Sequence, residues 1–294
     1  MTTRRTFLIG AAALLGAGTS GRAAFARPPQ DMQEKIAGIE SQVKGRLGVA
    51  VLDTGSDRRF GYREDERFPM CSTFKLLAAA AILKRVEKGQ ETLERRVHFS
   101  KSDLVTYSPV TEKHVESGMS VAELCEAAIT LSDNTAGNLM LGMLGGPSGV
   151  TAFARTLGDP LTRLDRTEPT LNEAVPGDVR DTTTPAAMAE NLRKLMFGNA
   201  LAKASSEQLK AWLLANKTGD ARLRARLPSG WRVGDKTGSG ERGSTNDAGI
   251  LWPPNSAPIV VAAYLTETAA PADRRNEALA AVGEAVAEAF RTRS

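Results

Sequence analysis

Histidine and cysteine, which serve many nucleophilic and metal-dependent enzymes, are scarce in this chain. The sequence has two histidines and two cysteines among 294 residues. Neither His98 nor His114 lies near a serine-containing motif, so the pattern gives little support to a Ser-His-Asp triad. The sequence also has no His-x-His pair and no two cysteines at the spacing of metal ligands. We therefore expect no metal ion and no other cofactor.

Basic residues form no long run, and the sequence shows no internal repeat. The formal net charge is +4, from 38 lysine and arginine residues against 34 aspartate and glutamate residues. Three of the 38 lie in the first 26 residues, which have no acidic residue, and this leaves 35 against 34 in the rest of the chain. This near balance argues against nucleic acid as a partner.

The first 26 residues have the pattern of an export signal. The paired arginines Arg4 and Arg5 precede a short apolar stretch over residues 9–18, which favours the twin-arginine route over the general secretory route. Residues 24–26 read Ala-Phe-Ala, the small-x-small pattern of a cleavage site. The apolar stretch is too short to span a bilayer comfortably, and no second one follows. We expect cleavage after about Ala26 and a periplasmic or secreted protein without membrane contact in its mature form.

The two cysteines, Cys71 and Cys125, are expected to remain free thiols. Two cysteines in an exported protein can form a disulfide, but nothing in the pattern brings these two together. Cys71 directly precedes Ser72, and Cys125 lies in a helix-like stretch, where a buried thiol behaves as a small apolar side chain. Cys71 is a poor candidate nucleophile, because no histidine is near it and Ser72 has better partners.

Apolar periodicity predicts strands at both ends of the chain and helices between them. The predicted strands are residues 47–53, 58–64, 231–235, 245–252 and 259–266; the predicted helices are 31–44, 72–86, 120–131, 134–144, 148–156, 184–196, 205–216 and 272–290. The late strands are too close together for helical crossovers, so the sheet is expected to be antiparallel. The fold class is therefore α/β of the α+β type: a five-stranded antiparallel sheet flanked by helices, with an inserted all-helical lobe.

This organisation divides the chain after the export signal into two lobes of one catalytic domain, 27–294. The α/β lobe is expected to comprise about residues 27–66 and 217–294, and the helical lobe about residues 67–216. A cleft between the two lobes is the natural place for a binding site.

Three short motifs occur in a fixed order: S-x-x-K at residues 72–75, S-D-N at 132–134 and K-T-G at 236–238. Ser72 and Lys75 are three residues apart and share a helix face. They lie in a first helical turn, where the helix dipole contributes only about 0.3–1 kcal/mol toward a negative charge. Deprotonation of Ser72 therefore needs a base, and a desolvated Lys75 can serve.

A long segment without periodicity, residues 163–183, holds a fourth motif. It reads Arg-Thr-Glu-Pro-Thr-Leu-Asn from Arg166 to Asn172, and Asp181 follows. A loop of this length in a compact domain is usually functional or disordered.

Together, the three motifs and this loop resemble class A serine β-lactamases, and residues 166–184 and 235–240 are most similar to the CTX-M type. S-x-x-K, S-D-N and K-T-G are the known signature of these enzymes and of penicillin-binding proteins. The loop resembles the Ω-loop of class A. Penicillin-binding proteins and penicillin-sensing receptors lack the glutamate of this loop. The resemblance covers nearly all of the chain after the export signal.

The resemblance implies a role for each matched residue. Ser72 is the nucleophile, Ser132 relays a proton to the leaving nitrogen, and Glu168 with Asn172 holds the hydrolytic water. Either Lys75, or Glu168 through a water, takes the proton of Ser72. The implied substrate-binding residues are Tyr107, Asn134, Asn172, Arg222, Lys236, Thr237 and Ser239, and the implied oxyanion hole consists of the backbone N–H groups of Ser72 and Ser239.

Some details depart from relatives within the family. Members of the family carry an extra arginine at one of three positions near the residues that bind the substrate carboxylate. In this sequence, two of these positions are Thr245 and Asn276, and the third is Arg222. The family's common disulfide would join Cys125 to position 79, and that of class A carbapenemases would join Cys71 to position 240. These positions are alanine and glycine, so neither bridge is expected and strong carbapenem hydrolysis is disfavoured.

The expected activity is hydrolysis of β-lactam antibiotics through a serine acyl-enzyme, which gives antibiotic resistance. Penicillins and cephalosporins are the expected substrates, and Ser239 and Gly240 permit oxyimino-cephalosporins. A D,D-peptidase or penicillin-binding protein and a covalent β-lactam sensor are the alternatives. The resemblance also implies a monomer with a small-molecule substrate.

Overall fold

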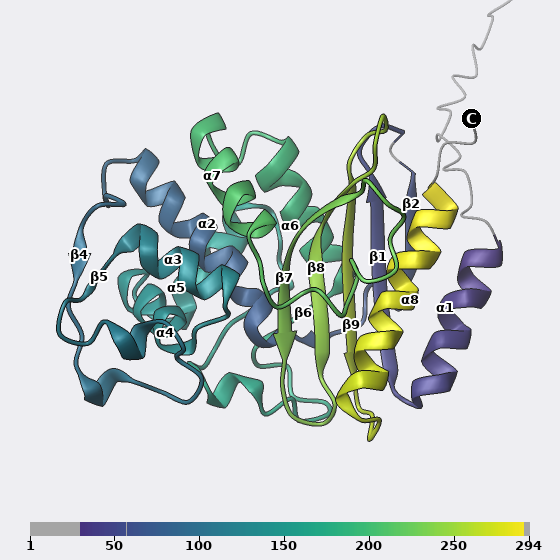
Figure 1. Ribbon diagram of the computed structural model, residues 1–294, viewed down its shortest axis with the longest axis horizontal. Coiled ribbons are helices and arrows are strands. Elements are labelled where there is room, and N and C mark those ends of the chain that lie inside the picture. Colours follow the sequence, from purple (N-terminus) through teal and green to yellow (C-terminus); the bar gives the residue numbers. More distant parts are fainter. Residues whose placement is uncertain (1–29, 57, 291–294) are drawn as a thin grey trace, which may run out of the picture.

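The computed structural model of the protein describes residues 30–56 and 58–290, and the predicted export signal and its cleavage site lie outside this range. Figure 1 shows a sheet with helices on both sides and a mainly helical region beside it. None of the helices in the described range is long and apolar enough to cross a membrane.

The main sheet has five strands in the order β2-β1-β9-β8-β7, and every neighbouring pair is antiparallel. Its strands are β1 (Arg46–Asp53), β2 (Arg59–Tyr62), β7 (Arg232–Ser239), β8 (Thr245–Trp252) and β9 (Ile259–Thr266). The ends of the chain thus form one sheet, as the sequence predicted. β1 and β2 form the expected hairpin, in which Val51 lies opposite Phe60. β7 is an edge strand, so one of its edges has no neighbouring strand in the sheet.

One face of the sheet is covered by α1 (Gln30–Val43) and α8 (Ala272–Phe290), the purple and yellow helices of Figure 1. Side chains in a strand alternate between the two faces. Leu47, Val49 and Val51 of β1 pack with the two helices, whereas Ala50 and Leu52 join the core on the other face. Both faces of β1 are therefore buried, which explains its continuous apolar sequence.

The helices between β2 and β7 form the second core. They are α2 (Phe74–Glu87), α3 (Val121–Thr130), α4 (Asn134–Met143), α5 (Pro147–Thr156), α6 (Pro185–Phe197) and α7 (Lys203–Leu214). α2 is buried along its first ten residues, as an alanine- and leucine-rich helix without a polar face should be. α3 begins at a capping box, because Ser120 accepts from the N–H of Glu123 and the Glu123 carboxylate accepts from the N–H of Ser120.

Three features differ from the sequence-based expectation. β7 continues to Ser239, so K-T-G lies within an edge strand and does not follow it. α6 lies within the range expected for the helical lobe, yet it packs against β1 and β9. Four two-residue strands were not predicted, because such short elements are held by pairing with distant segments and leave no periodic pattern; they are β3 (Phe68–Pro69), β4 (Arg96–Val97), β5 (Met119–Ser120) and β6 (Thr182–Thr183).

Candidate active site

Ser72 lies in a single 3-10 turn, Cys71–Thr73, that leads directly into α2. The sequence predicted an α-helix from Ser72 onward, and the α-helical part begins two residues later. Cys71 has a positive φ of 45°, which turns the chain sharply ahead of Ser72. Asn246 of β8 holds this turn by donating from its side chain to the carbonyl of Met70 at 3.1 Å. Gly238 permits the close packing, since a Cβ there would lie 2.8 Å from that same carbonyl.

Lys75 is fully buried and lies at the centre of a polar cluster. Its Nζ donates to the Oγ of Ser72 at 3.0 Å, to the carbonyl of Ser132 at 2.8 Å and to the Oδ1 of Asn134 at 2.7 Å. The Oε1 of Glu168 also lies 3.0 Å from this Nζ. Gly137 of α4 leaves the space for the side chain, because a Cβ there would lie 2.7 Å from the Cε of Lys75.

Burial and charge act on Lys75 in opposite directions. Desolvation lowers the pKa of Lys75, and the carboxylate of Glu168 counteracts part of this shift. The net direction is downward from the ordinary value. A lysine with a lowered pKa releases its proton more readily, so burial favours proton exchange between Lys75 and neighbouring hydroxyl groups.

Ser132 connects the helical region to β7. Its Oγ accepts from the Nζ of Lys236 at 3.0 Å, and its carbonyl accepts from Lys75. Desolvation is the first cause that lowers the pKa of Lys236 well below the ordinary value, and the positive charges of Lys75 and Arg222 lower it further. Ser132 itself has a positive φ of 58°. Two buried amines with lowered pKa values thus contact Ser132, Lys236 at its hydroxyl and Lys75 at its carbonyl.

The other two residues of S-D-N have separate positions. Asp133 is the N-cap of α4, and its fully buried carboxylate accepts from the N–H groups of Ala136 at 2.8 Å and Thr111 at 2.9 Å. Asn134 points the other way: its amide donates to the carbonyl of Thr106 at 2.8 Å while its Oδ1 contacts Lys75. Asp133 therefore stabilises the junction between α3 and α4, whereas Asn134 faces the site.

Glu168 is 2% exposed and reaches Ser72 directly. The Oγ of Ser72 donates to its Oε1 at 3.0 Å, and the side-chain amide of Asn172 donates to its Oε2. Asn138 of α4 fixes the backbone of Glu168 twice, by donating to its carbonyl and accepting from its N–H, both at 2.9 Å. The Glu168–Pro169 peptide bond is cis.

The loop that carries Glu168 is held at both ends. Arg166 forms an ion pair with the buried Asp181 through Nε and Oδ2. The second carboxylate oxygen of Asp181 accepts from the N–H groups of Asp165 at 2.8 Å and Arg166 at 2.9 Å. The carbonyl of Asp181 accepts from the N–H of Met70 at 2.8 Å. This bond connects the end of the loop to the segment just before Ser72.

A cleft of about 400 Å³ opens in front of these groups. It contains eight of the eleven predicted site residues, which are Ser72, Tyr107, Ser132, Asn134, Asn172, Arg222, Thr237 and Ser239, together with Thr218 and Gly238. The other three, Lys75, Glu168 and Lys236, are buried directly behind them. Tyr107 is 56% exposed, consistent with a position at the rim.

Arg222 is the extra arginine at the β7 side of the cleft. Its guanidinium donates to the Oγ of Ser239 at 2.7 Å, to the carbonyl of Gly238 at 2.8 Å and to the Oδ1 of Asn276 at 3.1 Å. Among the described residues it forms no ion pair. Thr245 is buried in β8, so of the three candidate positions only that of Arg222 carries a cation to the cleft.

Sequence reasoning missed two residues of the site. Asn138 lies four residues after Asn134 on α4, and this helical spacing could have indicated that both amides face the same side. Thr218 shares a short hydrogen bond with the hydroxyl of Thr237, but it lies in an irregular segment and no sequence pattern distinguishes it. Both cysteines are buried and free, as predicted.

Comparisons with known proteins agree with this geometry. A family profile described as the β-lactamase enzyme family matches residues 31–290. The β-lactamase OXY-1 of Klebsiella oxytoca is 52% identical over 97% of this chain and 97% of its own length. The β-lactamase CTX-M-8 of Citrobacter amalonaticus is 50% identical over 92% of this chain and 93% of its own.

A solved structure agrees as well. The class A β-lactamase of the last common ancestor of Gram-negative bacteria (GNCA4) superimposes with a TM-score of 0.88 at 64% identity, covering 88% of this chain and 99% of that chain. The chain therefore belongs to the β-lactamase enzyme family, and within that family to class A.

Proposed function

We propose that Ser72 opens the β-lactam ring of penicillins and cephalosporins, and that Glu168 then directs the water that releases the product. The observation that carries this proposal is the buried triangle of Ser72 Oγ, Lys75 Nζ and Glu168 Oε1, whose three sides are each 3.0 Å. It provides a nucleophile, a cation and a base in mutual contact, where general base catalysis typically contributes about 10²–10⁴-fold.

In the first step, the Oγ of Ser72 attacks the lactam carbonyl carbon and its proton leaves to a base. Ser72 donates to the carboxylate of Glu168 while Lys75 donates to Ser72. This hydrogen-bond direction favours Glu168 as the first proton acceptor and Lys75 as the cation that stabilises the developing alkoxide. The backbone N–H groups of Ser72 and Ser239 would bind the carbonyl oxygen, which is negative in the transition state. The exposed edge of β7 makes the N–H of Ser239 a suitable donor.

The second half of acylation breaks the C–N bond of the ring. The ring nitrogen takes a proton from the hydroxyl of Ser132, and Lys236 or Lys75 replaces that proton. The lowered pKa values of both lysines suit this transfer. Asn134 and Thr237 would hold the substrate's side-chain amide and carboxylate, with Arg222 adding positive charge near the carboxylate.

Deacylation uses the same carboxylate, after Glu168 has passed the proton of Ser72 to Lys75, whose Nζ lies 3.0 Å away, and so has replaced the proton that the lysines gave to the ring nitrogen through Ser132. Glu168 then accepts a proton from water, the resulting hydroxide attacks the ester carbon, and Glu168 returns that proton to the Oγ of Ser72 as it leaves. Asn172 orients Glu168 and provides a second polar group for the water. Tyr107 would contact the substrate at the mouth of the cleft.

We also propose the setting in which this activity operates. The pattern of residues 4–26 supports export and a periplasmic or secreted enzyme that confers antibiotic resistance. The nearly neutral charge of the remaining chain supports a small-molecule substrate and no nucleic acid as a partner. The resemblance to class A enzymes supports a monomer. The lobe boundaries near residues 66 and 217 belong to the same proposal.

Loss of lactam absorbance with benzylpenicillin tests the proposed function. We expect sustained turnover by the wild-type protein and no turnover above background by Ser72→Ala. Cys71→Ala is the matched control and should retain turnover, because the thiol is buried and this burial raises its pKa, which disfavours the nucleophilic thiolate. Consumption of a single equivalent would instead identify a penicillin-binding protein or a sensor.

A further inference from the structure

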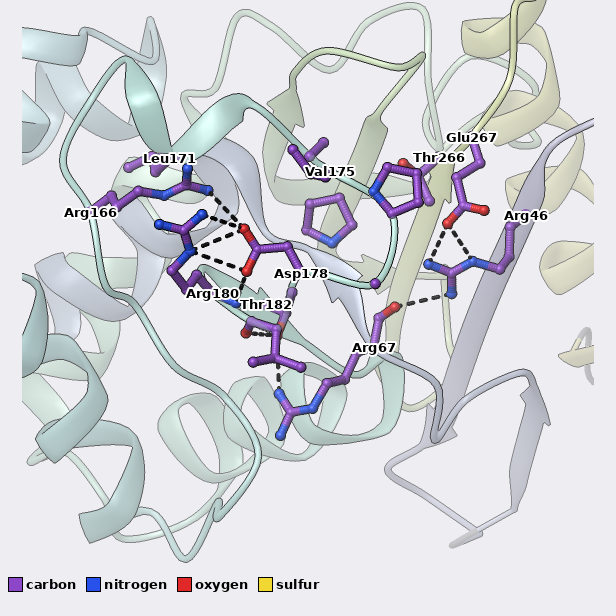
Figure 2. Close-up of a pocket in the computed structure, with 15 residues that line it drawn as sticks. Arg46, Arg67, Arg166, Leu171, Val175, Asp178, Arg180, Thr182, Thr266 and Glu267 are labelled. Carbon is purple, nitrogen blue, oxygen red and sulfur yellow. Dashed lines mark hydrogen bonds and ion pairs between the residues drawn. The ribbon is translucent and has the colours of Figure 1, made fainter.

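A second cavity, of about 390 Å³, lies behind the Ω-loop and outside the cleft. One wall is the second half of the loop, from Leu171 to Arg180, and the other comes from Arg46, Arg67 and the end of β9. Figure 2 shows these side chains surrounding the space. None of the residues that line it also lines the cleft in front of Ser72.

The loop wall of this cavity is apolar at its rim. Val175 and Val179 are 40% and 46% exposed, and both are among the few large apolar side chains that the described surface leaves open. Leu171, which is fully buried, continues the apolar surface inward. Apolar side chains along one wall of a concave space favour contact with the apolar part of a ligand over contact with water.

The same cavity contains four arginines, and three of them are paired with carboxylates. Arg46 pairs with Glu267 at 2.9 Å, Arg180 pairs with Asp178 at 2.7 Å, and Arg166 pairs with Asp181. Dashed lines in Figure 2 mark the first two of these ion pairs. These three guanidinium groups are therefore electrostatically compensated within the protein.

Arg67 is different. Its Nη1 donates to the carbonyl of Leu161 at 2.9 Å and to the hydroxyl of Thr182 at 3.0 Å, both of which are uncharged. Within the described residues it forms no ion pair. A half-buried guanidinium with only neutral acceptors has further N–H donors for an anion.

We propose that this cavity binds a small amphiphilic carboxylate, whose head group pairs with Arg67 and whose apolar part lies against Val175 and Val179. A carboxylate matches the planar donor pattern of a guanidinium. The paired acidic side chains of the cavity disfavour ligands of higher negative charge, which supports a single carboxylate.

The position of the cavity connects such a ligand to both halves of the catalytic machinery. Pro69, which lies three residues before Ser72, lines the cavity together with Leu171, the neighbour of Asn172. Pro69 also pairs with Thr182 across the short strands β3 and β6. A bound ligand therefore contacts the loop and the strand that holds it, and should stabilise the docked loop by mass action.

Octanoate is a suitable probe, with octanol as its uncharged counterpart and acetate as its counterpart without an apolar part. We expect the melting temperature to rise with octanoate concentration, and both counterparts to have much weaker effects. In amide NMR spectra, octanoate should shift signals of residues 175–180 and 266–267, and leave those of 132–134 and 237–239 unchanged.

Two variants test the assignment of Arg67. Arg67→Gln retains a side-chain donor for Leu161 and Thr182 and should weaken octanoate binding by about tenfold or more, the range expected for a lost charged hydrogen bond. Val179→Glu adds a negative charge at the exposed rim, so it should weaken binding without disturbing the core. Arg163→Gln is the matched control, because Arg163 pairs with Asp165 on the same loop and does not line the cavity.

Three results would overturn the proposal. Equal binding of octanol and octanoate would show that no anion site exists. Unchanged octanoate affinity in both Arg67→Gln and Val179→Glu would show that the octanoate carboxylate does not bind in this cavity. Shifts confined to the residues of the cleft would place the ligand in front of Ser72. All readouts measure binding, so they are independent of the proposed function.

Discussion

Lys75 and Glu168 form a fully buried ion pair, with Nζ 3.0 Å from Oε1. The two residues come from different regions, one from the first turn of α2 and the other from the long loop after α5. Breaking this pair destabilises the protein, because the remaining charge is then buried without a partner of opposite sign. The pair thus couples the position of the Ω-loop to the protonation state of Lys75.

This coupling predicts a change in how stability depends on pH. The pKa of Lys75 is lowered in the folded protein and ordinary in the unfolded chain, so the unfolded state binds more protons between the two values and stability rises with pH there. Glu168→Gln removes the negative charge that counteracts the lowering of the Lys75 pKa. The pH range in which stability rises with pH should therefore extend to lower pH in this variant.

Urea unfolding between pH 6 and pH 10 measures this effect. We expect the free energy of unfolding of Glu168→Gln to rise more steeply with pH than that of the wild type, by up to about 1.4 kcal/mol per pH unit. Lys75→Met is the control. It has no amine at this position, so its free energy of unfolding should lack the pH dependence that Lys75 contributes. Parallel curves for wild type and Glu168→Gln would contradict the proposed coupling.

Asn138 is predicted to act as a positioning residue for Glu168. Asn138→Ala removes both hydrogen bonds to the backbone of Glu168, and each buried group left without a partner costs about 1–3 kcal/mol. We expect a slower deacylation, by about 10–100-fold, with a smaller effect on acylation. Asn138→Asp keeps the acceptor for the N–H of Glu168 and should be intermediate. Rapid-quench measurement of both steps checks this, and an unchanged deacylation rate constant would exclude the role.

Arg222 is predicted to contribute substrate affinity. It brings a guanidinium without an ion pair in the described structure to the β7 side of the cleft, where a substrate carboxylate would lie. Arg222→Ala should raise KM by about 10–100-fold, as expected for a charged hydrogen bond, with a smaller effect on kcat. Arg226→Ala is the control, because Arg226 is exposed and pairs with Glu284 outside the cleft. Equal kinetic effects of the two variants would show that Arg222 contributes no more to substrate binding than an exposed arginine outside the cleft.

Asp247 is predicted to limit stability at neutral pH. Burial, together with the negative charge of Asp235, raises the pKa of Asp247 well above its ordinary value, and its Oδ1 has no hydrogen-bond partner in the part of the chain that the structure describes. Since the folded pKa is raised, the contribution of Asp247 to stability is complete below the ordinary pKa of 3.8 and is lost as pH rises through the folded value.

Asp247→Asn should therefore be more stable than the wild type at pH 8, with a melting temperature higher by about 2–4 °C for each kcal/mol gained. The difference should disappear toward pH 3.5. Asp235→Asn is the opposite case: it removes the buried ion pair with Arg224 and should lower the melting temperature. A variant at Asp247 that is less stable at pH 8 would contradict this account.

Much of the fold could be predicted because its elements carry local signals. The short apolar runs of β1 and β9 indicated strands, and the apolar periodicity of residues 120–131 indicated α3. The end of β7 was missed because Gly238 and Ser239 are poor strand formers; pairing with β8 extends the strand through them. β3 and β6 likewise exist only because a distant segment pairs with each.

The identities of the candidate site residues could be predicted from the sequence, but the contacts between them could not. The motifs and their resemblance to class A identified Ser72, Lys75 and Glu168. No local pattern indicated that Ser72 and Glu168 lie within 3.0 Å of each other across 96 positions of sequence. The second cavity also depends on tertiary structure, since Arg46, Arg67 and Val175 come together only when the loop packs on the end of the sheet.

The most direct test of the central claim is the intact mass of the wild-type protein and of Glu168→Ala, sampled over time after mixing with benzylpenicillin. The account predicts a transient adduct of one antibiotic on the wild type, which disappears as many equivalents are consumed. Glu168→Ala should accumulate the same adduct, because Lys75 remains in contact with Ser72 and can still take its proton in acylation, whereas deacylation without its general base slows by about 10²–10⁴-fold. Normal turnover by Glu168→Ala, or a permanent adduct on the wild type, would contradict it.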